Sequence, residues 1–240
     1  MTVNPCARCG VRPAEARTTL CARCVLIVSG IDGNESMLVD ANESPPCELL
    51  SIIGETPRAI TFLGEQRWPV RRLVTLKVLK TEGCSPDAVA RALRPVPAHP
   101  SIAAILESGY MAGRPYVMTT FLGGGAIINR FASIATTASA RVDALLRIAD
   151  ALFFAHAQGL AHGRLVASNL LCEAHAPFAV HIVDFECNAR KAAGDVPFEI
   201  LEREDVDAVL ALAHALRVDV ERLRRSATTA LDLRRGFEQM

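Results

Sequence analysis

The chain has 240 residues, half of them hydrophobic and 22% charged, which is enough to bury the core of one large or two modest domains. Lysine plus arginine and aspartate plus glutamate both number 26, so no overall field attracts nucleic acid or an anionic membrane, and we expect neither as a partner. No segment is long and apolar enough to span a bilayer, and the N-terminus lacks the basic and apolar stretches of a secretory signal. We therefore expect a cytoplasmic protein.

Four of the eight cysteines form two C-x-x-C pairs close to the N-terminus. The four are Cys6, Cys9, Cys21 and Cys24. Each pair turns two sulfurs toward one point, and two such pairs complete a tetrahedral thiolate site for structural Zn²⁺. A redox dithiol is the alternative, but no strand and helix pattern surrounds either pair. We expect residues 1–31 to form a zinc ribbon, and residues 32–47, rich in acids, Ser, Asn and Pro, to be a linker.

Residues 48–121 carry the pattern of a small antiparallel sheet with one helix. Three segments rich in β-forming residues, 49–54, 59–64 and 70–80, are separated by turn residues and predict consecutive strands. Residues 85–93 begin with an N-capping Ser and a Pro at the first helical position, which predicts the helix. Further apolar runs before residue 121 predict a second pair of strands. We expect these residues to form one lobe of a larger fold.

Residues 122–240 carry mostly helical patterns. Apolar residues recur at helical spacing over 138–157 and predict a long core helix. A polar loop and a strand over 179–186 follow, then a second buried helix that includes 205–213. One amphipathic segment over 220–237 completes the chain. We expect these residues to form a second lobe, which is helical.

Residues 151–190 resemble the catalytic segment of eukaryotic-type protein kinases, which include bacterial Ser/Thr kinases. The catalytic loop of that family reads H-R-D-L-x-x-x-N, and a metal-binding D-F-G follows it. The residues that match in register are His162, Leu165, Asn169, Asp184 and Phe185. The resemblance covers about residues 48–216. It implies an α+β, two-lobed protein-kinase-like fold with a truncated helical large lobe, since only one further amphipathic segment remains.

The same resemblance implies which residues would bind ATP and Mg²⁺. They are Gly54 at the start of the Gly-rich loop, Lys77 in the V-A-I-K strand, Thr120 at the hinge, and Asn169 and Asp184 on the metal. Asp205 matches the acid that holds the catalytic loop from below in this family. No Ser, Thr or Tyr occurs between Cys187 and Glu204, so phospho-activation in that loop is excluded.

The catalytic chemistry is altered at two places. Arg164 stands where the family has the Asp that accepts the substrate proton, and a guanidinium has no lone pair to accept one. Arg164 has two candidate roles: it binds a phosphate, or it pairs with Asp184 or with Glu186, which replaces the D-F-G glycine. Of the two we expect the pairing. In the Gly-rich loop only Gly54 remains, because Thr56 and Ala59 replace the other two glycines and Pro57 removes a backbone donor.

These residues predict a catalytically impaired pseudokinase that acts as a binding or regulatory module. Its partner would be a protein, such as an active kinase or the substrate of one. The alternative is a weak or atypical ATP-dependent Ser/Thr protein kinase that uses Lys77, Asn169 and Asp184. A gene product without a selected activity is a third reading that one sequence leaves open.

Overall fold

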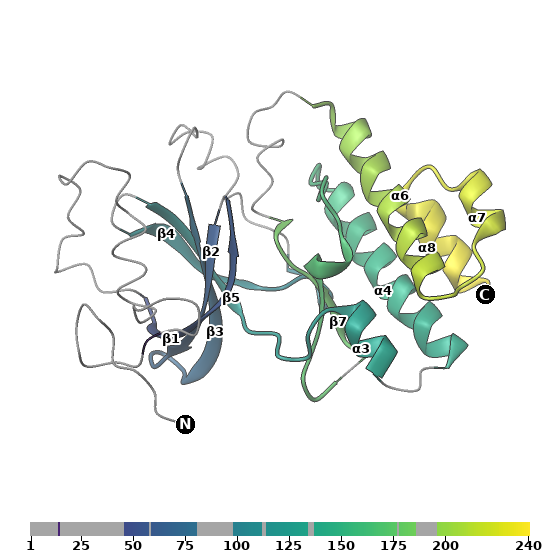
Figure 1. Ribbon diagram of the computed structural model, residues 1–240. Coiled ribbons are helices and arrows are strands. Elements are labelled where there is room, and N and C mark those ends of the chain that lie inside the picture. The colour runs from purple at the N-terminus through teal and green to yellow at the C-terminus, as the bar shows by residue number, and fades with distance from the viewer. Residues whose placement is uncertain are drawn as a thin grey trace. The chain divides into compact units, whose positions relative to one another are not determined.

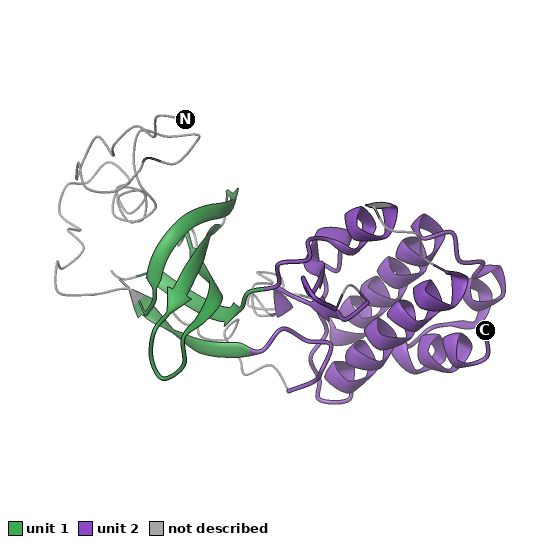
Figure 2. Cartoon of the chain, turned by 90° about the horizontal axis from the view of Figure 1, so that it is seen from below, with its two compact units in different colours: residues 1–85, 105–121 green, residues 86–104, 122–240 purple. Residues whose placement is uncertain are grey.

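The computed structural model describes residue 14 and residues 46–57, 59–80, 98–111, 114–133, 137–176, 178–185 and 196–240. These residues form two compact units, which Figure 2 colours green and purple. Unit 1 contains described residues from 46 to 80 and from 105 to 121, and unit 2 contains those from 98 to 104 and from 122 to 240. None of the helices that the structure describes is long and apolar enough to cross a membrane.

Unit 1 is a five-stranded antiparallel sheet with the order β1-β2-β3-β5-β4. The strands, labelled in Figure 1, are β1 (Glu48–Thr56), β2 (Ala59–Gln66), β3 (Arg72–Leu79), β4 (Ile105–Met111) and β5 (Arg114–Thr120). This confirms the three predicted consecutive strands and the following pair. The predicted helix over residues 85–93 lies outside the described residues.

The core of unit 1 lies on one face of this sheet. Burial alternates along β3, where Val74, Leu76 and Val78 are buried and the residues between them are only half-buried. The alternation follows from the two-residue period of a strand. Phe62 of β2 and Met118 of β5 are fully buried in the same cluster. The residues between these positions, including Lys77, therefore point to the opposite face.

Unit 2 is mainly helical. Its elements are α3 (Ile127–Ser133), α4 (Ala138–His156), the 3₁₀ turn η1 (Ala167–Asn169), β6 (Leu170–Cys172), β7 (Val180–Ile182), α6 (Phe198–Ala215), α7 (Glu221–Ser226) and α8 (Ala230–Glu238). The predicted core helix is α4, and α6 and α8 pack against it. The short strands β6 and β7 form a separate antiparallel pair on either side of a turn. One continuous core joins these helices and strands.

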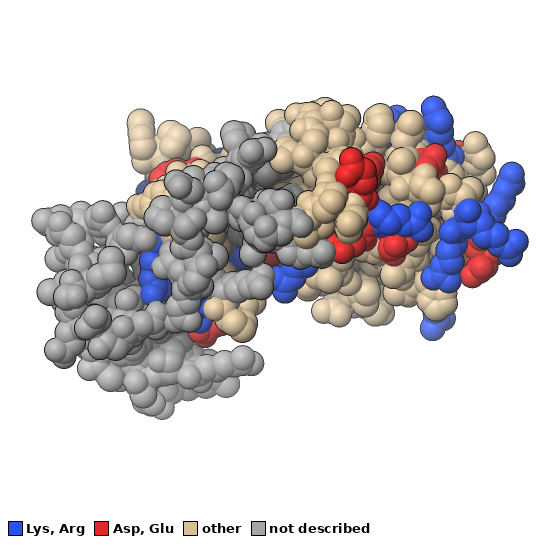
Figure 3. All heavy atoms as spheres, turned by 90° about the horizontal axis from the view of Figure 1, so that it is seen from above, with Lys and Arg blue, Asp and Glu red and all other residues tan. Residues whose placement is uncertain are grey.

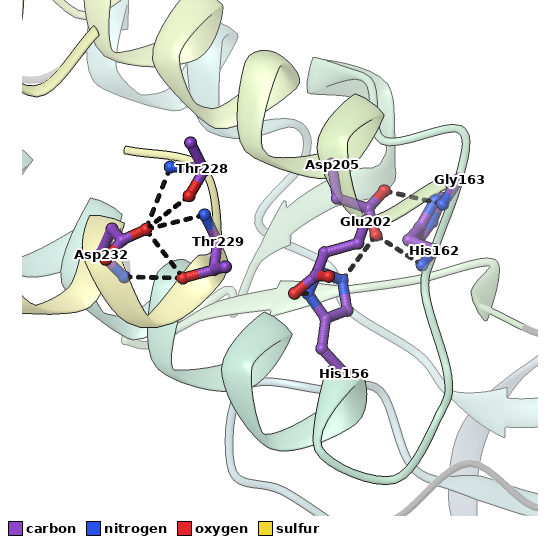
Figure 4. A network of polar contacts seen from close by, with 8 residues as sticks. All are labelled: His156, His162, Gly163, Glu202, Asp205, Thr228, Thr229 and Asp232. Carbon is purple, nitrogen blue, oxygen red and sulfur yellow. Dashed lines mark hydrogen bonds and ion pairs between the residues drawn. The ribbon is translucent and has the colours of Figure 1, made fainter. Parts of the chain in front are cut away.

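The predicted amphipathic segment over 220–237 is two helices rather than one. The chain leaves α7 at Ala227 and re-enters a helix at Ala230. Asp232 fixes this break, because its carboxylate accepts hydrogen bonds from the backbone N–H and hydroxyl groups of both Thr228 and Thr229 (Figure 4). The Thr229 side chain in turn accepts the backbone N–H of Asp232, which completes a capping box.

Candidate functional site

The loop that resembles a catalytic loop is held from below by a buried carboxylate. Asp205 lies on α6 with its side chain fully buried. Its two oxygens accept the backbone N–H groups of His162 at 2.6 Å and of Gly163 at 2.7 Å (Figure 4). Gly163 has a φ of 66°, a left-handed conformation that glycine adopts without a Cβ penalty. The structure thus confirms the expectation that Asp205 anchors this loop.

A buried imidazole completes the environment of this carboxylate. The Nε2 atom of His156, at the end of α4, donates to Asp205 at 2.9 Å, because a carboxylate can only accept. Its Nδ1 atom lies 3.4 Å from a carboxylate oxygen of Glu202, one turn earlier on α6. The ring also packs edge-on against Phe198. Asp205 therefore receives three hydrogen bonds, which offset the cost of burying its charge.

The side chain of His162 joins the loop to the strand that ends in Asp-Phe. Its Nε2 atom lies 3.0 Å from the carbonyl oxygen of Val183, and its Nδ1 atom accepts the backbone N–H of Arg164 at 3.2 Å. Since a carbonyl only accepts, this pattern assigns the proton of the neutral ring to Nε2. The ring of Phe185 meets it edge-on at 5.0 Å between centroids. The side chain of His162 therefore connects the loop to the segment that contains Val183 and Phe185.

The backbone of Arg164 is fixed on both sides while its side chain is exposed. Its N–H donates to His162, as above, and its carbonyl oxygen accepts the Asn169 side-chain amide at 3.3 Å. The guanidinium forms no ion pair with any residue that the structure describes. The expected pairing with Asp184 is therefore not found, and Glu186 lies outside the described residues. Proximity of opposite charges in the sequence did not determine the direction of this side chain.

Asp184 has an unusual backbone conformation. Its φ is 69°, in the left-handed region that costs a non-glycine residue free energy and is enriched at functional sites. The residue before it is tied to the loop, because the Val183 N–H donates to the carbonyl oxygen of Asn169 at 2.9 Å. One backbone hydrogen bond thus links Asn169 to the residue that precedes Asp184, within unit 2.

The predicted nucleotide residues of unit 1 lie on one sheet, and two of them share a row. Gly54 pairs with Thr61, and Thr61 pairs with Lys77, so these positions align across β1, β2 and β3 on one face. Lys77 is half-buried in a strand with neighbours on both sides, which excludes a solvated lysine at a sheet edge. Thr120 ends β5 next to Val74 and is exposed, so it belongs to another part of the sheet.

The β1–β2 turn is closed by a side chain. Thr56 and Ala59 are the last paired residues of the two strands. The Thr56 hydroxyl oxygen accepts the Ala59 N–H at 3.1 Å and donates to the Ala59 carbonyl oxygen at 3.3 Å. In a kinase phosphate loop, backbone N–H groups are directed at the phosphates instead. Here the N–H at the third glycine position is already bonded within the turn.

One contact of this site was not predicted from the sequence, and one predicted metal site lies outside the described residues. His156 was expected to be a packed or surface residue rather than a ligand, and it is buried next to the anchor. Glu202, which lies beside it, was not singled out from the sequence. The predicted zinc ligands Cys6, Cys9, Cys21 and Cys24 lie outside the described residues. Among described residues, no group of three or more His, Cys, Asp or Glu side chains is arranged to bind a metal ion.

The similarity of this chain to known proteins lies in its three-dimensional structure. No protein-family model and no curated protein matches the sequence. The kinase domain of PknI from M. tuberculosis matches at a TM-score of 0.60 and 18% identity, over 81% of this chain and 94% of that one. Rad53 residues 1–466 in complex with AMP-PNP match at a TM-score of 0.60 and 20% identity, over 71% of this chain. That match spans 48% of the Rad53 chain. The chain has a protein-kinase-like fold.

Proposed function

We propose that the chain is a protein-kinase-like binding or regulatory module whose phosphoryl transfer is impaired. The observation that supports this most is Arg164. Its backbone is held by His162 and Asn169, inside a loop that Asp205 anchors. The loop therefore keeps a defined position for the catalytic residue and presents a cation there.

The chemical consequence follows from the charge of Arg164. Phosphoryl transfer to a hydroxyl group uses a carboxylate at this position to accept or orient the proton. A guanidinium is permanently protonated at neutral pH, so it cannot take that role. General-base assistance typically contributes about 10²–10⁴ in rate, so its loss lowers turnover without removing every trace of it.

The β1–β2 turn does not offer ATP phosphates the backbone N–H groups that a kinase phosphate loop offers. Thr56 occupies the N–H of Ala59, and Pro57 has no N–H to offer. Asn169 and Asp184 still provide oxygens of the type that Mg²⁺ binds, because the Asn169 amide nitrogen, not its oxygen, contacts Arg164. The two residues that the resemblance assigns to Mg²⁺ therefore keep suitable oxygens, whereas positions 57 and 59 of the turn have no free N–H for a phosphate.

A weak phosphotransferase is the second candidate. Its support is Lys77, held in a central strand in line with Gly54, together with Asn169, which bonds the residue before Asp184. Rad53, which shares the fold, is described in complex with the ATP analogue AMP-PNP. This candidate requires that ATP and Mg²⁺ bind despite the closed turn, with Thr120 at the hinge.

A thermal-shift titration with ATP and Mg²⁺ distinguishes the two candidates. Saturation at about 100 times Kd adds about 2.7 kcal/mol to stability, which raises the Tm of a chain of this size by roughly 5–10 °C. The binding module predicts no such shift and no transfer of the γ-phosphate to a general protein acceptor. A shift that Lys77→Ala and Asp184→Ala both abolish, together with transfer of the γ-phosphate that the same substitutions abolish, would support the enzyme instead.

Two further parts of the proposal concern residues that the structure does not describe and partners that it does not contain. The spacing of Cys6, Cys9, Cys21 and Cys24 supports a structural zinc ribbon. Metal analysis of freshly purified, reduced protein should then find about one zinc per chain. A protein partner, such as an active kinase or its substrate, is the kind of ligand that a module without catalysis would regulate.

A further inference from the structure

The connection between β2 and β3 carries the most exposed large apolar side chain that the structure describes. The last paired residues are Gln66 and Arg72, so residues 67–71 form the connection, which we call the β2–β3 tip. Trp68 is 83% exposed there and Val70 is 60% exposed. Trp68 is also the single tryptophan of the chain. An exposed tryptophan is uncommon on a soluble surface and is the residue type most enriched in interface hot spots.

Arginines are fixed around these apolar side chains. The Nε atom of Arg71 donates to Glu65 at 2.8 Å, and Arg67 contacts both Glu65 and Glu48. The hydrogen bond from Arg71 holds the pKa of Glu65 below its ordinary value, so Glu65 remains an acceptor at neutral pH. At the base of the tip, the Nε atom of Arg72 donates to the side chain of Gln66 at 2.7 Å.

These contacts leave donors that face outward. Arg71 is held only through Nε, and its two terminal nitrogens have no partner among the residues that the structure describes. The Arg71 side chain is 80% exposed. A guanidinium that is already oriented loses less side-chain entropy when a carboxylate binds to it. Two of its N–H groups can donate to the two oxygens of one carboxylate at the same time. The tip thus combines the exposed apolar side chains of Trp68 and Val70 with oriented guanidinium groups.

We propose that the β2–β3 tip is a docking element that inserts Trp68 and Val70 into an apolar pocket of a partner protein, with carboxylates on the pocket rim facing Arg67 and Arg71. Trp and Arg are the residue types that supply most of the binding energy at protein interfaces. A lipid surface fits less well, because Glu48 and Glu65 offset two of the three arginines and leave little net field. Discrete carboxylates can still bind the remaining guanidinium nitrogens.

The tip contains none of the residues assigned to nucleotide or metal binding. The docking role therefore goes beyond the proposed function and stands even if the chain transfers phosphate. A failure of docking would equally leave the account of Arg164 and Thr56 intact. The two proposals are thus separated by experiment.

The test selects partners by chemistry alone. A random dodecapeptide display library without tryptophan is panned against the full-length chain, and binders are counter-selected against the Trp68→Ser variant. We expect binders that carry Asp or Glu on both sides of large apolar residues. Their binding should shift the emission of Trp68 to shorter wavelength as the ring leaves water. Trp68→Ser should weaken them by roughly 30-fold or more, as for a hot-spot residue, and Arg67→Gln with Arg71→Gln by at least about tenfold.

Matched controls decide between the outcomes. Arg222→Gln with Arg225→Gln removes two exposed arginines of α7 in unit 2 and should leave the peptide affinities unchanged. In Figure 3, basic side chains gather in the part of unit 2 that contains α7 and α8. A loss of affinity in this control would therefore indicate attraction to arginine in general. That loss, or a library without Trp68-dependent acidic binders, overturns the proposal. So does an emission shift of Trp68 on phosphatidylglycerol vesicles alone, which would make the tip a lipid-binding element.

Discussion

The loop around Arg164 in unit 2 and the β1–β2 turn in unit 1 both resemble functional segments of protein kinases in sequence, yet they differ in which contacts remain. In the loop, the groups that hold the backbone are complete, since Asp205 bonds two consecutive N–H groups and His162 bonds Val183. Within the H-R-D-L pattern, Gly163 and Arg164 replace the Arg and the Asp, while the backbone contacts remain. In the turn, the backbone N–H of Ala59 is bonded to Thr56, and Pro57 has no N–H.

This difference separates the two jobs that a kinase loop performs. Groups such as Asp205 and His156 stabilise the fold whether or not phosphate is transferred. Removing Asp205 leaves buried donors without their acceptor, and removing His156 takes one of three hydrogen bonds from a buried carboxylate. The N–H groups of a phosphate loop contribute to nucleotide binding and not to folding. An internal hydrogen bond to such an N–H therefore costs no stability. Substitutions in the two regions should therefore differ sharply in their effect on folding.

Removing the anchor should have the largest effect. Asp205→Ala leaves the buried His156 and the N–H groups of His162 and Gly163 without their acceptor. Breaking a buried pair in this way costs about 3–5 kcal/mol. We expect the Tm to fall by roughly 6 °C or more, measured by circular dichroism in thermal and urea unfolding.

Asp207→Ala is the matched control on the same helix. Its carboxylate is exposed and pairs with Arg203 one turn earlier, so its loss should change stability by less than about 0.5 kcal/mol. Equal losses for the two variants would show that the contacts of Asp205 with the loop do not stabilise unit 2, and the contrast between anchor and turn would fail.

A second carboxylate in unit 2 should show a smaller effect that depends on pH. Burial opposes ionisation of Asp232, but hydrogen bonds from Thr228 and Thr229 outweigh it and lower its pKa below the ordinary 3.8. Since the folded-state value is the lower one, the carboxylate stabilises the fold above about pH 4, and this contribution is lost as the pH falls through the folded-state value. Asp232→Ala should cost about 1 kcal/mol at pH 7.

Urea unfolding of Asp232→Ala and the unsubstituted chain between pH 7 and pH 3 tests this. The difference in free energy of unfolding should be constant from pH 7 to pH 5 and should narrow below pH 4. A difference that grows on acidification would mean that the charge of Asp232 does not stabilise the break between α7 and α8.

The sequence predicted those parts of the molecule that depend on order along the chain. Alternation and turn residues predicted the strands, and the resemblance to protein kinases implied that Asp205 would hold the loop. It did not predict the contact of His156 with Glu202, because those residues are 46 positions apart and their approach depends on how α4 packs against α6. It also did not predict α3, a helix of only seven residues.

The direction of individual side chains also could not be predicted from the sequence. The expected partner of Arg164 was chosen from the charges nearby in the motif, whereas the structure leaves this guanidinium exposed without an ion pair to any described residue. The break at Ala227 was also missed, because an apolar stripe at helical spacing continues through it. The capping box of Thr229 and Asp232 is the signal that would have located it, since Thr followed three residues later by an acid marks a helix start.

In unit 1, the hydroxyl of Thr56 should contribute modestly to stability. Thr56→Val keeps the shape and leaves the N–H of Ala59, a buried residue, without its acceptor. We expect a loss of about 1 kcal/mol and no gain in ATP binding, since Pro57 still lacks a donor. Thr61→Val, on the neighbouring strand, is the control and should be neutral. Tight ATP binding by Thr56→Val would show that the closed turn is all that excludes the nucleotide.

The smallest expected effect is at Gly54, and it tests the comparison most directly. A Cβ atom there would meet Thr61 at 3.7 Å, an ordinary contact, whereas at Gly64 it would meet the Cys47 sulfur at 2.5 Å. Gly54→Ala should therefore leave the Tm almost unchanged, and Gly64→Ala should lower stability by about 1–3 kcal/mol. If packing does not require glycine at position 54, only the close approach of a ligand could require it. The binding module predicts that Gly54→Ala behaves like the unsubstituted chain with ATP and Mg²⁺, and a selective loss of nucleotide binding would favour the weak kinase.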